Sequence, residues 1–250
     1  PNPQSPIPNP QSPIPIISHQ TFNNIVKSKL IIIFFLEKMY TRWLPFLKNK
    51  NIILGSGSPR RRELLTELGI NFKVVKSEFP ENLKKEGVDP KKYVEETCLG
   101  KFNYFLSHQK VENCDILITA DSIVEFKNKI LEKPKSKEEC KAWFKEYSGN
   151  KVIAYTYMVI GVIDKDRKCI SKRNFLTTTY VNFDTLSEEC IDDYINTDEP
   201  YDKAGGFGIQ ANAKSLITGI EGDFYNVVGF PVNAFTKNLT SLLEEVYGKK

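Results

Sequence analysis

The amino-acid sequence predicts an α/β fold with a mixed central sheet flanked by helices. Apolar runs typical of buried strands alternate with helical segments through the first half of the domain, and two long β-rich runs follow. A glycine-serine turn, Gly55 to Ser58, joins the first strand to the first helix. A chain of 250 residues with 40% hydrophobic content is long enough for one substantial domain, built as two lobes around a cleft.

Hydrophobic periodicity and capping signals place the elements. The first half is expected to hold a strand at 51–54, a helix at 59–68 closed by Gly69, a strand at 72–76 and a helix from Asp89-Pro90 to Gln109. A buried strand at 116–120 that ends on Asp121 and a hairpin at 123–131 come next. The second half is expected to hold a helix capped by Ser136 and Glu139, β-rich runs at 152–163 and 169–183, a helix from Ser187 to Ile195, and a closing helix from Pro231.

Residues 1–50 are predicted to be an N-terminal extension to a domain at 51–250. Residues 2–8 are repeated without change at 9–15, and this proline-rich tandem is predicted to be disordered. An unselected tail is favoured over a ligand for SH3-type or WW-type modules. The apolar run 30–36 is too short to span a bilayer, although an organelle address in 1–50 stays open, as does a shorter product that starts at Met39.

Composition excludes several classes of function. The formal charge of +4, from 35 basic and 31 acidic residues, is too balanced to predict binding to nucleic acid or a membrane. The five cysteines are an odd number without a C-x-x-C pair, so we expect reduced thiols and a cytoplasmic protein. With only His19 and His108 available, a zinc site and a Cys-His catalytic pair are both set aside.

Three arginines, Arg60 to Arg62, stand at the start of the first helix. A helix N-terminus is effectively positive, so each of these cations should cost about 0.3–1 kcal/mol unless an anion lies among them. Ser58 can cap the helix and Pro59 suits its first turn, while Gly55 and Gly57 let backbone N–H groups turn toward a phosphate. A solvated basic helix end is an equally good interpretation of the arginines alone.

Asp121 follows an apolar strand, where ligands bind in open α/β sheets, and its carboxylate can hold a metal ion or accept a proton from water. Capping of the next turn is the alternative role. Lys133 precedes Pro134, which fixes an extended backbone and aims the lysine side chain. Glu81, Lys101 and Lys203, taken singly, are ordinary surface charges.

Four segments, in order, resemble motifs of the Maf family of nucleoside triphosphate pyrophosphatases. They are Gly55 to Leu65, Ala120 to Val124 with Leu131 to Pro134, Asp202 to Gln210, and Gly222 to Pro231. The resemblance covers residues 51–248. It implies a two-lobed fold related to inosine triphosphate pyrophosphatases, with a nucleotide cleft and a divalent metal cofactor, usually Mg²⁺, with Mn²⁺ as an alternative. It implies house-cleaning hydrolysis of a triphosphate between its α and β phosphates, and homodimerisation is expected from it alone.

The resemblance also implies roles for particular residues. Asp121 matches the catalytic proton acceptor, and Glu81 with Asp121 matches the metal site. Positions that bind substrate are matched by Ser56, Arg60, Lys101, Lys133, Lys203 and Gln210. Arginine directly after Pro59 is similar to the subfamily that acts on dTTP and UTP, whereas the sister group that prefers 7-methyl-GTP has a bulky aromatic there.

Three positions depart from the family pattern. Val152 stands where a histidine is common, Ser122 replaces a threonine, and Pro80 replaces an acidic residue, which could shift Glu81. The missing histidine and the repeat-bearing N-terminal tail keep a second interpretation open, a catalytically weak Maf-like nucleotide-binding or interaction module. A third interpretation, a nucleic-acid binder that uses Arg60 to Arg62, lacks aromatic residues interleaved with the arginines.

Overall fold

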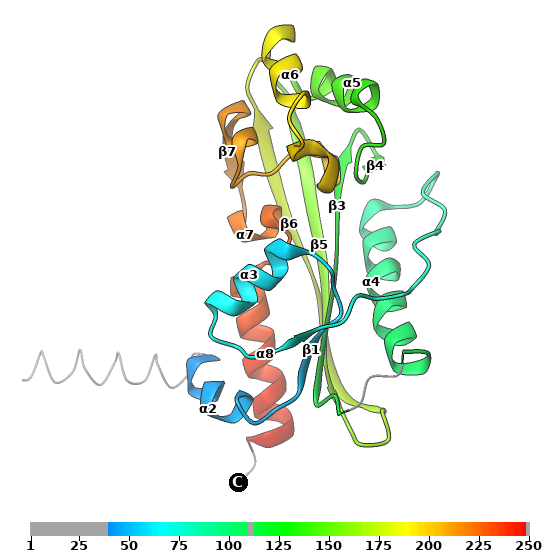
Figure 1. Cartoon of the computed structure of the whole chain (residues 1–250), viewed down its shortest axis with the longest axis vertical. Helices are drawn as coiled ribbons and strands as arrows, with labels where there is room; N and C mark the ends of the chain where they lie inside the picture. The colour runs from blue at the N-terminus through cyan, green and yellow to red at the C-terminus, as the bar shows by residue number, and fades with distance from the viewer. Residues whose placement is uncertain (1–39, 110–112, 249–250) are drawn as a thin grey trace, which may run out of the picture. The chain divides into compact units, whose positions relative to one another are not determined.

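A seven-stranded mixed sheet organises the part of the chain that the computed structural model describes, residues 40–109 and 113–248 (Figure 1). The strand order is β2-β1-β3-β5-β6-β7, and β4 pairs with β3 outside this path. The strands are β1 (Ile52–Leu54), β2 (Lys73–Val74), β3 (Ile116–Phe126), β4 (Lys129–Leu131), β5 (Lys151–Ile163), β6 (Cys169–Phe183) and β7 (Ile217–Glu221). β1 runs parallel to β2 and β3, whereas the other pairs are antiparallel, so the predicted mixed sheet is confirmed.

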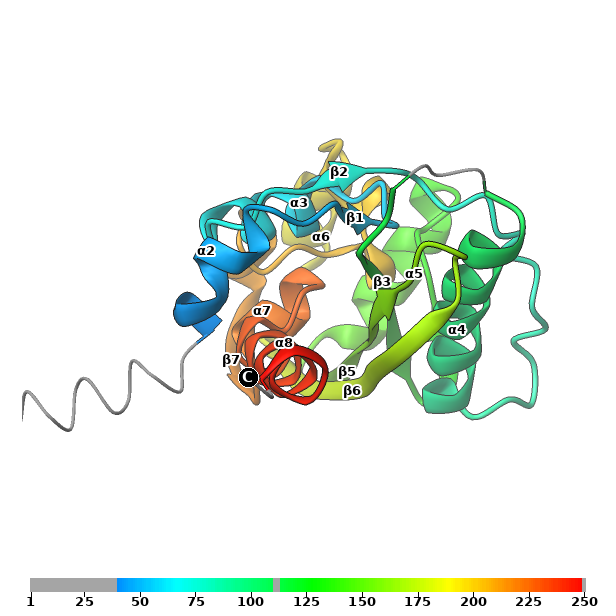
Figure 2. The same cartoon turned by 90° about the horizontal axis from the view of Figure 1, so that it is seen from below.

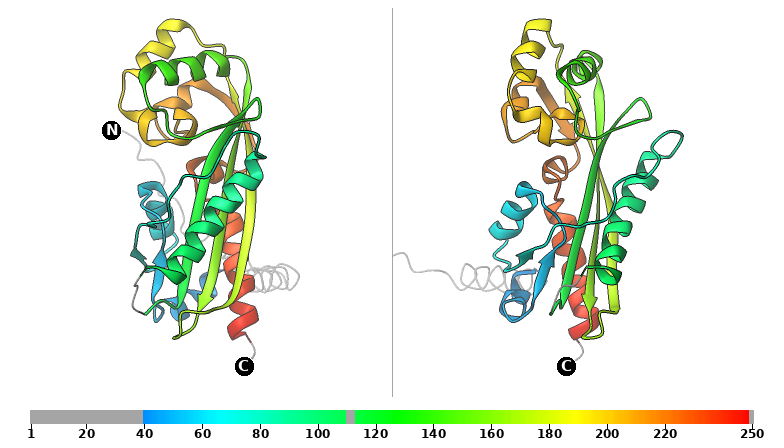
Figure 3. Two further views of the ribbon diagram at one scale, coloured as in Figure 1. Left: turned by 90° about the vertical axis from the view of Figure 1, so that its right-hand side faces the viewer. Right: turned by 45° about the vertical axis from the view of Figure 1, so that its right-hand side comes forward.

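Helices cover both faces of the sheet (Figures 2 and 3). The α-helices are α2 (Leu44–Leu47), α3 (Pro59–Glu67), α4 (Pro90–Ser107), α5 (Lys137–Tyr147), α6 (Glu188–Ile195), α7 (Phe224–Val228) and α8 (Val232–Tyr247). Short 3₁₀ helices are η1 (Tyr40–Trp43), η2 (Glu199–Asp202), η3 (Ala204–Gly206) and η4 (Asn212–Leu216). None of the helices within the described ranges is long and apolar enough to cross a membrane.

Alternation along β3 assigns its side chains to two cores. Ile116, Ile118 and Ala120 pack with α3 and α8, whereas Leu117 and Ile123 pack with α4 on the opposite face. By the same period of two, Asp121 faces α4 and Ser122 faces α3. The strand therefore presents the two polar residues in the middle of its length to different helices.

A third core lies beyond the middle of the long strands, between their far ends and helices α5 and α6 (Figure 1). Val152 is fully buried in this core, with Phe144 and Phe183 among its members. The valine that replaces a common histidine therefore contributes to apolar packing, and it does not line the cavity described below.

Two local predictions are wrong. β3 does not end on Asp121 but continues to Phe126, because β5 pairs with it without interruption from Ile116 to Glu125. Ser58 occupies the N-cap position of α3, yet its side chain makes no capping hydrogen bond; its backbone N–H donates to Ser56 Oγ instead. By contrast, Ser136 and Ser187 each cap their helices as predicted.

Residues 40–47 pack on the first core, with Leu47 only 1% exposed. The compact unit therefore begins at Tyr40, within the segment that the sequence analysis assigned to the extension. The proline-rich repeat at 2–15, the apolar run at 30–36 and Met39 lie outside the described residues.

Candidate active site

The site lies where one edge of β3 changes partner. β1 pairs with β3 as far as the Leu54 to Ile118 pair, and β4 pairs with it only from Val124. Between these pairs, within the described part of the chain, residues 119–123 have no strand partner on this edge. The interval exposes Asp121 and Ser122 to the turn that follows β1, whose Gly55 N–H donates to Ile118 O at 2.8 Å.

A cavity of about 540 Å³ opens at this interval, a size that suits a small-molecule ligand. All eight site residues that the sequence analysis named line it: Ser56, Arg60, Glu81, Lys101, Asp121, Lys133, Lys203 and Gln210. They come from the turn after β1, α3, the loop after β2, α4, β3, the segment after β4, and the segment around η3. The structure thus brings the eight residues together, while their chemical roles stay predictions.

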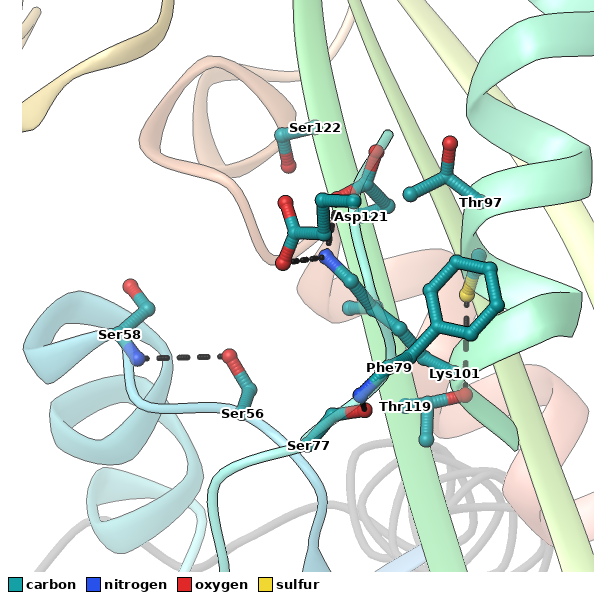
Figure 4. Close-up of polar contacts among 12 residues, drawn as sticks. Ser56, Ser58, Ser77, Phe79, Thr97, Lys101, Thr119, Asp121 and Ser122 are labelled. Atoms are coloured by element: carbon teal, nitrogen blue, oxygen red, sulfur yellow. Dashed lines mark hydrogen bonds and ion pairs between the residues drawn. The ribbon is translucent and has the colours of Figure 1, made fainter. Parts of the chain in front are cut away.

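Asp121 and Lys101 form a buried ion pair at the floor of the cavity (Figure 4). Lys101 Nζ donates to Asp121 Oδ1 at 2.7 Å and lies 3.0 Å from Glu81 Oε1. Burial raises the pKa of Asp121 above its usual range, although the charges of Lys101 and Arg61 oppose this shift. The pKa of Lys101 is raised because the two carboxylates outweigh its burial, so its ammonium group stays charged.

Arg61 is buried and connects the segments that surround the cavity. Its Nε donates to Gly229 O at 2.9 Å, and its NH1 donates to Ser56 Oγ at 2.9 Å and to Ala120 O at 2.8 Å. Its NH2 donates to Ser122 Oγ at 2.8 Å. One guanidinium therefore fixes the turn after β1, the unpaired edge of β3 and the loop between α7 and α8.

Arg60 and Lys203 converge on one carboxylate, that of Asp202. Arg60 NH1 lies 2.8 Å from Asp202 Oδ2, and Arg60 NH2 donates to Asp202 O at 3.1 Å. Lys203 Nζ lies 2.5 Å from Asp202 Oδ1 and donates to Glu199 O at 2.7 Å. Of the arginines at the helix start, Arg60 is thus paired with a carboxylate and Arg61 is hydrogen-bonded to neutral oxygens, whereas Arg62 is exposed.

Glycines around η3 make room for this arrangement. A Cβ on Gly208 would lie 2.6 Å from Lys203 Cε, so a larger residue there would displace the end of the lysine side chain from its present position. Gly205 has a φ of +68° and packs against Val124, where a Cβ would approach to 2.7 Å. Lys133 and Gln210 are exposed at the same cavity.

The motif at 222–231 supports the site from behind. Asn226 is buried and donates to Ala154 O at 3.1 Å and to Thr179 Oγ1 at 3.0 Å. Thr156 Oγ1 donates to Asn226 O at 3.2 Å and lies 2.9 Å from Ser122 Oγ. The network continues through Ser122 to Arg61, so β5 and β6 help to hold the guanidinium in place.

Sequence reasoning missed Arg61 and Asp202 as members of the site. Arg61 was visible only as one of three arginines, and nothing local distinguishes a buried arginine from a solvated one. Asp202 directly precedes Lys203, and this adjacency is the one signal that could have singled it out.

The carboxylates available for a metal ion are few. Within residues 40–109 and 113–248, no group of three or more His, Cys, Asp or Glu side chains could hold a metal. Glu81 and Asp121 nevertheless flank one cationic nitrogen, Lys101 Nζ. Mg²⁺ commonly binds to one or two carboxylates together with water and substrate phosphates, so this pair fits an ion shared with a triphosphate.

Comparison with known proteins places the chain in a family. The family model described as "Maf-like protein" matches residues 51–242. The chain belongs to the Maf family. Its predicted family resemblance is thereby confirmed, and the match spans all eight predicted residues of the Maf site.

Named relatives are similar over most of this Maf domain. A "dTTP/UTP pyrophosphatase" of Lachnoclostridium phytofermentans is 38% identical over 72% of this chain and 89% of its own length. One of Thermosipho melanesiensis is 40% identical over 73% of this chain and 93% of its own length. A human "Probable bifunctional dTTP/UTP pyrophosphatase/methyltransferase protein" is 38% identical over 78% of this chain, which spans only 32% of that protein's length.

Replacing Arg61 by lysine should destabilise this Maf domain by about 2–4 kcal/mol, because a single ammonium group cannot reach four separated acceptors and leaves some of them buried without a donor. Arg62→Lys is the matched control, since Arg62 is exposed one position further along the same helix, and it should change stability by less than about 0.5 kcal/mol. Urea unfolding of both variants measures the difference. Equal stability of the two variants would contradict the organising role of Arg61.

Proposed function

We propose that this Maf domain hydrolyses dTTP and UTP to the nucleoside monophosphate and pyrophosphate. The observation that carries the proposal is the convergence of a buried carboxylate and six cationic side chains on one cavity. The names of the bacterial relatives, which this chain matches over 89% and 93% of their length, support the choice of pyrimidine triphosphates. The free cysteines favour a reducing compartment such as the cytoplasm.

The cations suit the charge of the substrate and of the leaving group. Arg60, Lys133 and Lys203 lie on the cavity wall, where they would neutralise the triphosphate and then the departing pyrophosphate. Stabilisation of developing negative charge is the dominant requirement in phosphoryl chemistry. Lys101 already forms ion pairs with Asp121 and Glu81, so we propose that it orients these carboxylates and does not bind phosphate.

Asp121 is the proposed proton acceptor for the attacking water. Its carboxylate is ionised when paired with Lys101, and burial raises its pKa, which makes it a stronger base than an exposed aspartate. Asp121 accepts its hydrogen bond from Lys101 at Oδ1. Among the described residues, neither Lys101 nor Arg61 donates a hydrogen bond to the other carboxylate oxygen, Oδ2. Oδ2 is therefore the atom that we assign to water.

Glu81 and Asp121 would hold a divalent cation, which supplies charge neutralisation at the phosphates when bound. Glu81 suits this role because its side chain is 53% exposed on a loop and reaches the same lysine as Asp121. The replacement of an acidic residue by Pro80 has not moved Glu81 out of the cavity lining.

A non-catalytic nucleotide-binding module remains the alternative. It would bind a triphosphate without turnover, and it was suggested by the missing histidine. Because Val152 lies in an apolar core away from the cavity, its presence removes no group from the site. The nucleic-acid interpretation is weakened, since Arg61 is buried and Arg60 is paired with Asp202.

The purified protein with Mg²⁺ should release pyrophosphate from dTTP and UTP, and Asp121→Asn should lower kcat at least about 100-fold, because the amide cannot accept a proton. Asp166→Asn, in the turn between β5 and β6, removes the same charge far from the cavity and should retain full activity. Coupled detection of pyrophosphate measures both variants. A wild-type protein that binds these nucleotides without releasing pyrophosphate would favour the alternative module.

Glu81→Gln should raise the Mg²⁺ concentration required for half-maximal activity by about tenfold, because a carboxylate that contacts the ion is replaced by a neutral amide. Glu86→Gln is the control, since Glu86 is exposed on the same loop and does not line the cavity. Titration of Mg²⁺ into EDTA-treated protein measures the effect. An identical titration curve for wild type and Glu81→Gln would remove Glu81 from the metal site.

A further inference from the structure

The carboxylate of Asp202 occupies the position between two cations that face the cavity. Oδ2 of Asp202 lies 2.8 Å from Arg60 NH1, and Oδ1 lies 2.5 Å from Lys203 Nζ. Each carboxylate oxygen therefore contacts one of the two cations. This is the pattern in which two oxygens of a phosphoryl group would contact the same donors. All three side chains line the cavity.

The three side chains differ in exposure. Arg60 and Lys203 are largely buried, at 20% and 12% exposed, whereas Asp202 is 52% exposed. Partial burial works against the charge of Asp202, yet the hydrogen bonds from Lys203 and Arg60 outweigh it and hold the pKa of Asp202 below its usual range. Asp202 is therefore an anion throughout the neutral range, and of the three side chains it has the most contact with solvent.

We propose that Asp202 is an internal competitor for the phosphate subsite: its carboxylate neutralises Arg60 and Lys203 in the free protein and is displaced when a pyrophosphate group binds. This inference rests on the proposed function, because it takes Arg60 and Lys203 as phosphate-binding groups. Its consequence is weaker retention of pyrophosphate, since the carboxylate returns to the cations as the product leaves.

Arg60 and Lys203 are held in place by contacts that do not depend on the charge of Asp202. Arg60 also donates to the backbone carbonyl oxygen of Asp202, at 3.1 Å, and Lys203 donates to Glu199 O. Both anchors survive in Asp202→Asn, which keeps the size of the side chain and loses its charge. The variant should therefore leave the cations in place and remove only the competing anion.

The test is calorimetric titration of inorganic pyrophosphate into wild type, Asp202→Asn and a control, Glu188→Gln. Glu188 pairs with Lys145 at 2.6 Å, is 72% exposed and does not line the cavity, so the control removes one charge of the same sign elsewhere. Asp202→Asn should bind pyrophosphate about tenfold more tightly, because two partly exposed ion pairs no longer compete with it. Glu188→Gln should match wild type.

A second readout uses turnover. Product inhibition by pyrophosphate during dTTP hydrolysis should strengthen by a similar factor in Asp202→Asn and stay unchanged in Glu188→Gln. Asp202→Ser should behave like Asp202→Asn in both measurements, because it also removes the charge.

The outcomes separate the inference from the proposed function. Equal or weaker pyrophosphate binding by Asp202→Asn, with dTTP still hydrolysed by wild type, overturns the inference alone and makes Asp202 a residue that positions Arg60. If neither wild type nor Asp202→Asn binds pyrophosphate, Arg60 and Lys203 do not form a phosphate subsite and the inference falls. The proposed function falls as well only if wild type also fails to release pyrophosphate from dTTP and UTP.

Discussion

The buried guanidinium of Arg61 is the contact on which the rest of the site depends. It donates to oxygens of Ser56, Ala120, Ser122 and Gly229, which belong to three separate segments. Burial lowers the pKa of Arg61, and four neutral acceptors replace the water that the charge has lost. Because Ala120 and Ser122 flank Asp121, Arg61 fixes the backbone that carries the proposed proton acceptor, while Asp121 itself turns to the opposite face and meets Lys101.

The unpaired interval of β3 explains why a ligand in the cavity can reach the carboxylate of Asp121. A fully paired β3 would bury its edge, but β1 stops at Leu54 and β4 begins pairing only at Val124. On the edge between them, Ala120 O accepts a hydrogen bond from the Arg61 guanidinium rather than from a neighbouring strand. Two of the cavity's cations are paired with carboxylates, Lys101 with Asp121 and Arg60 with Asp202. Neither charge is therefore left without a partner in the free protein.

Local signals predicted local structure well. The caps at Ser136 and Ser187 and the left-handed Gly69 follow from neighbouring residues, and the motifs led to eight side chains of one cavity. Non-local features could not be predicted in the same way. The strand β3 continues past Asp121 because β5 pairs with it. Arg61 can be buried because backbone carbonyl groups distant in sequence accept hydrogen bonds from its guanidinium. Carbonyl groups are common to every residue, so no sequence pattern identifies them as partners.

The most direct test of this account is a crystal structure of the Asp121→Asn protein with dTTP and Mg²⁺, in which turnover is blocked. We expect the triphosphate in the cavity, with phosphate oxygens on Arg60, Lys133 and Lys203 and the α-phosphate beside residue 121. We also expect that the bonds from Arg61 to Ser56, Ala120, Ser122 and Gly229 are unchanged from the free protein. A triphosphate bound elsewhere, or one whose α-phosphate lies away from residue 121, would contradict the account.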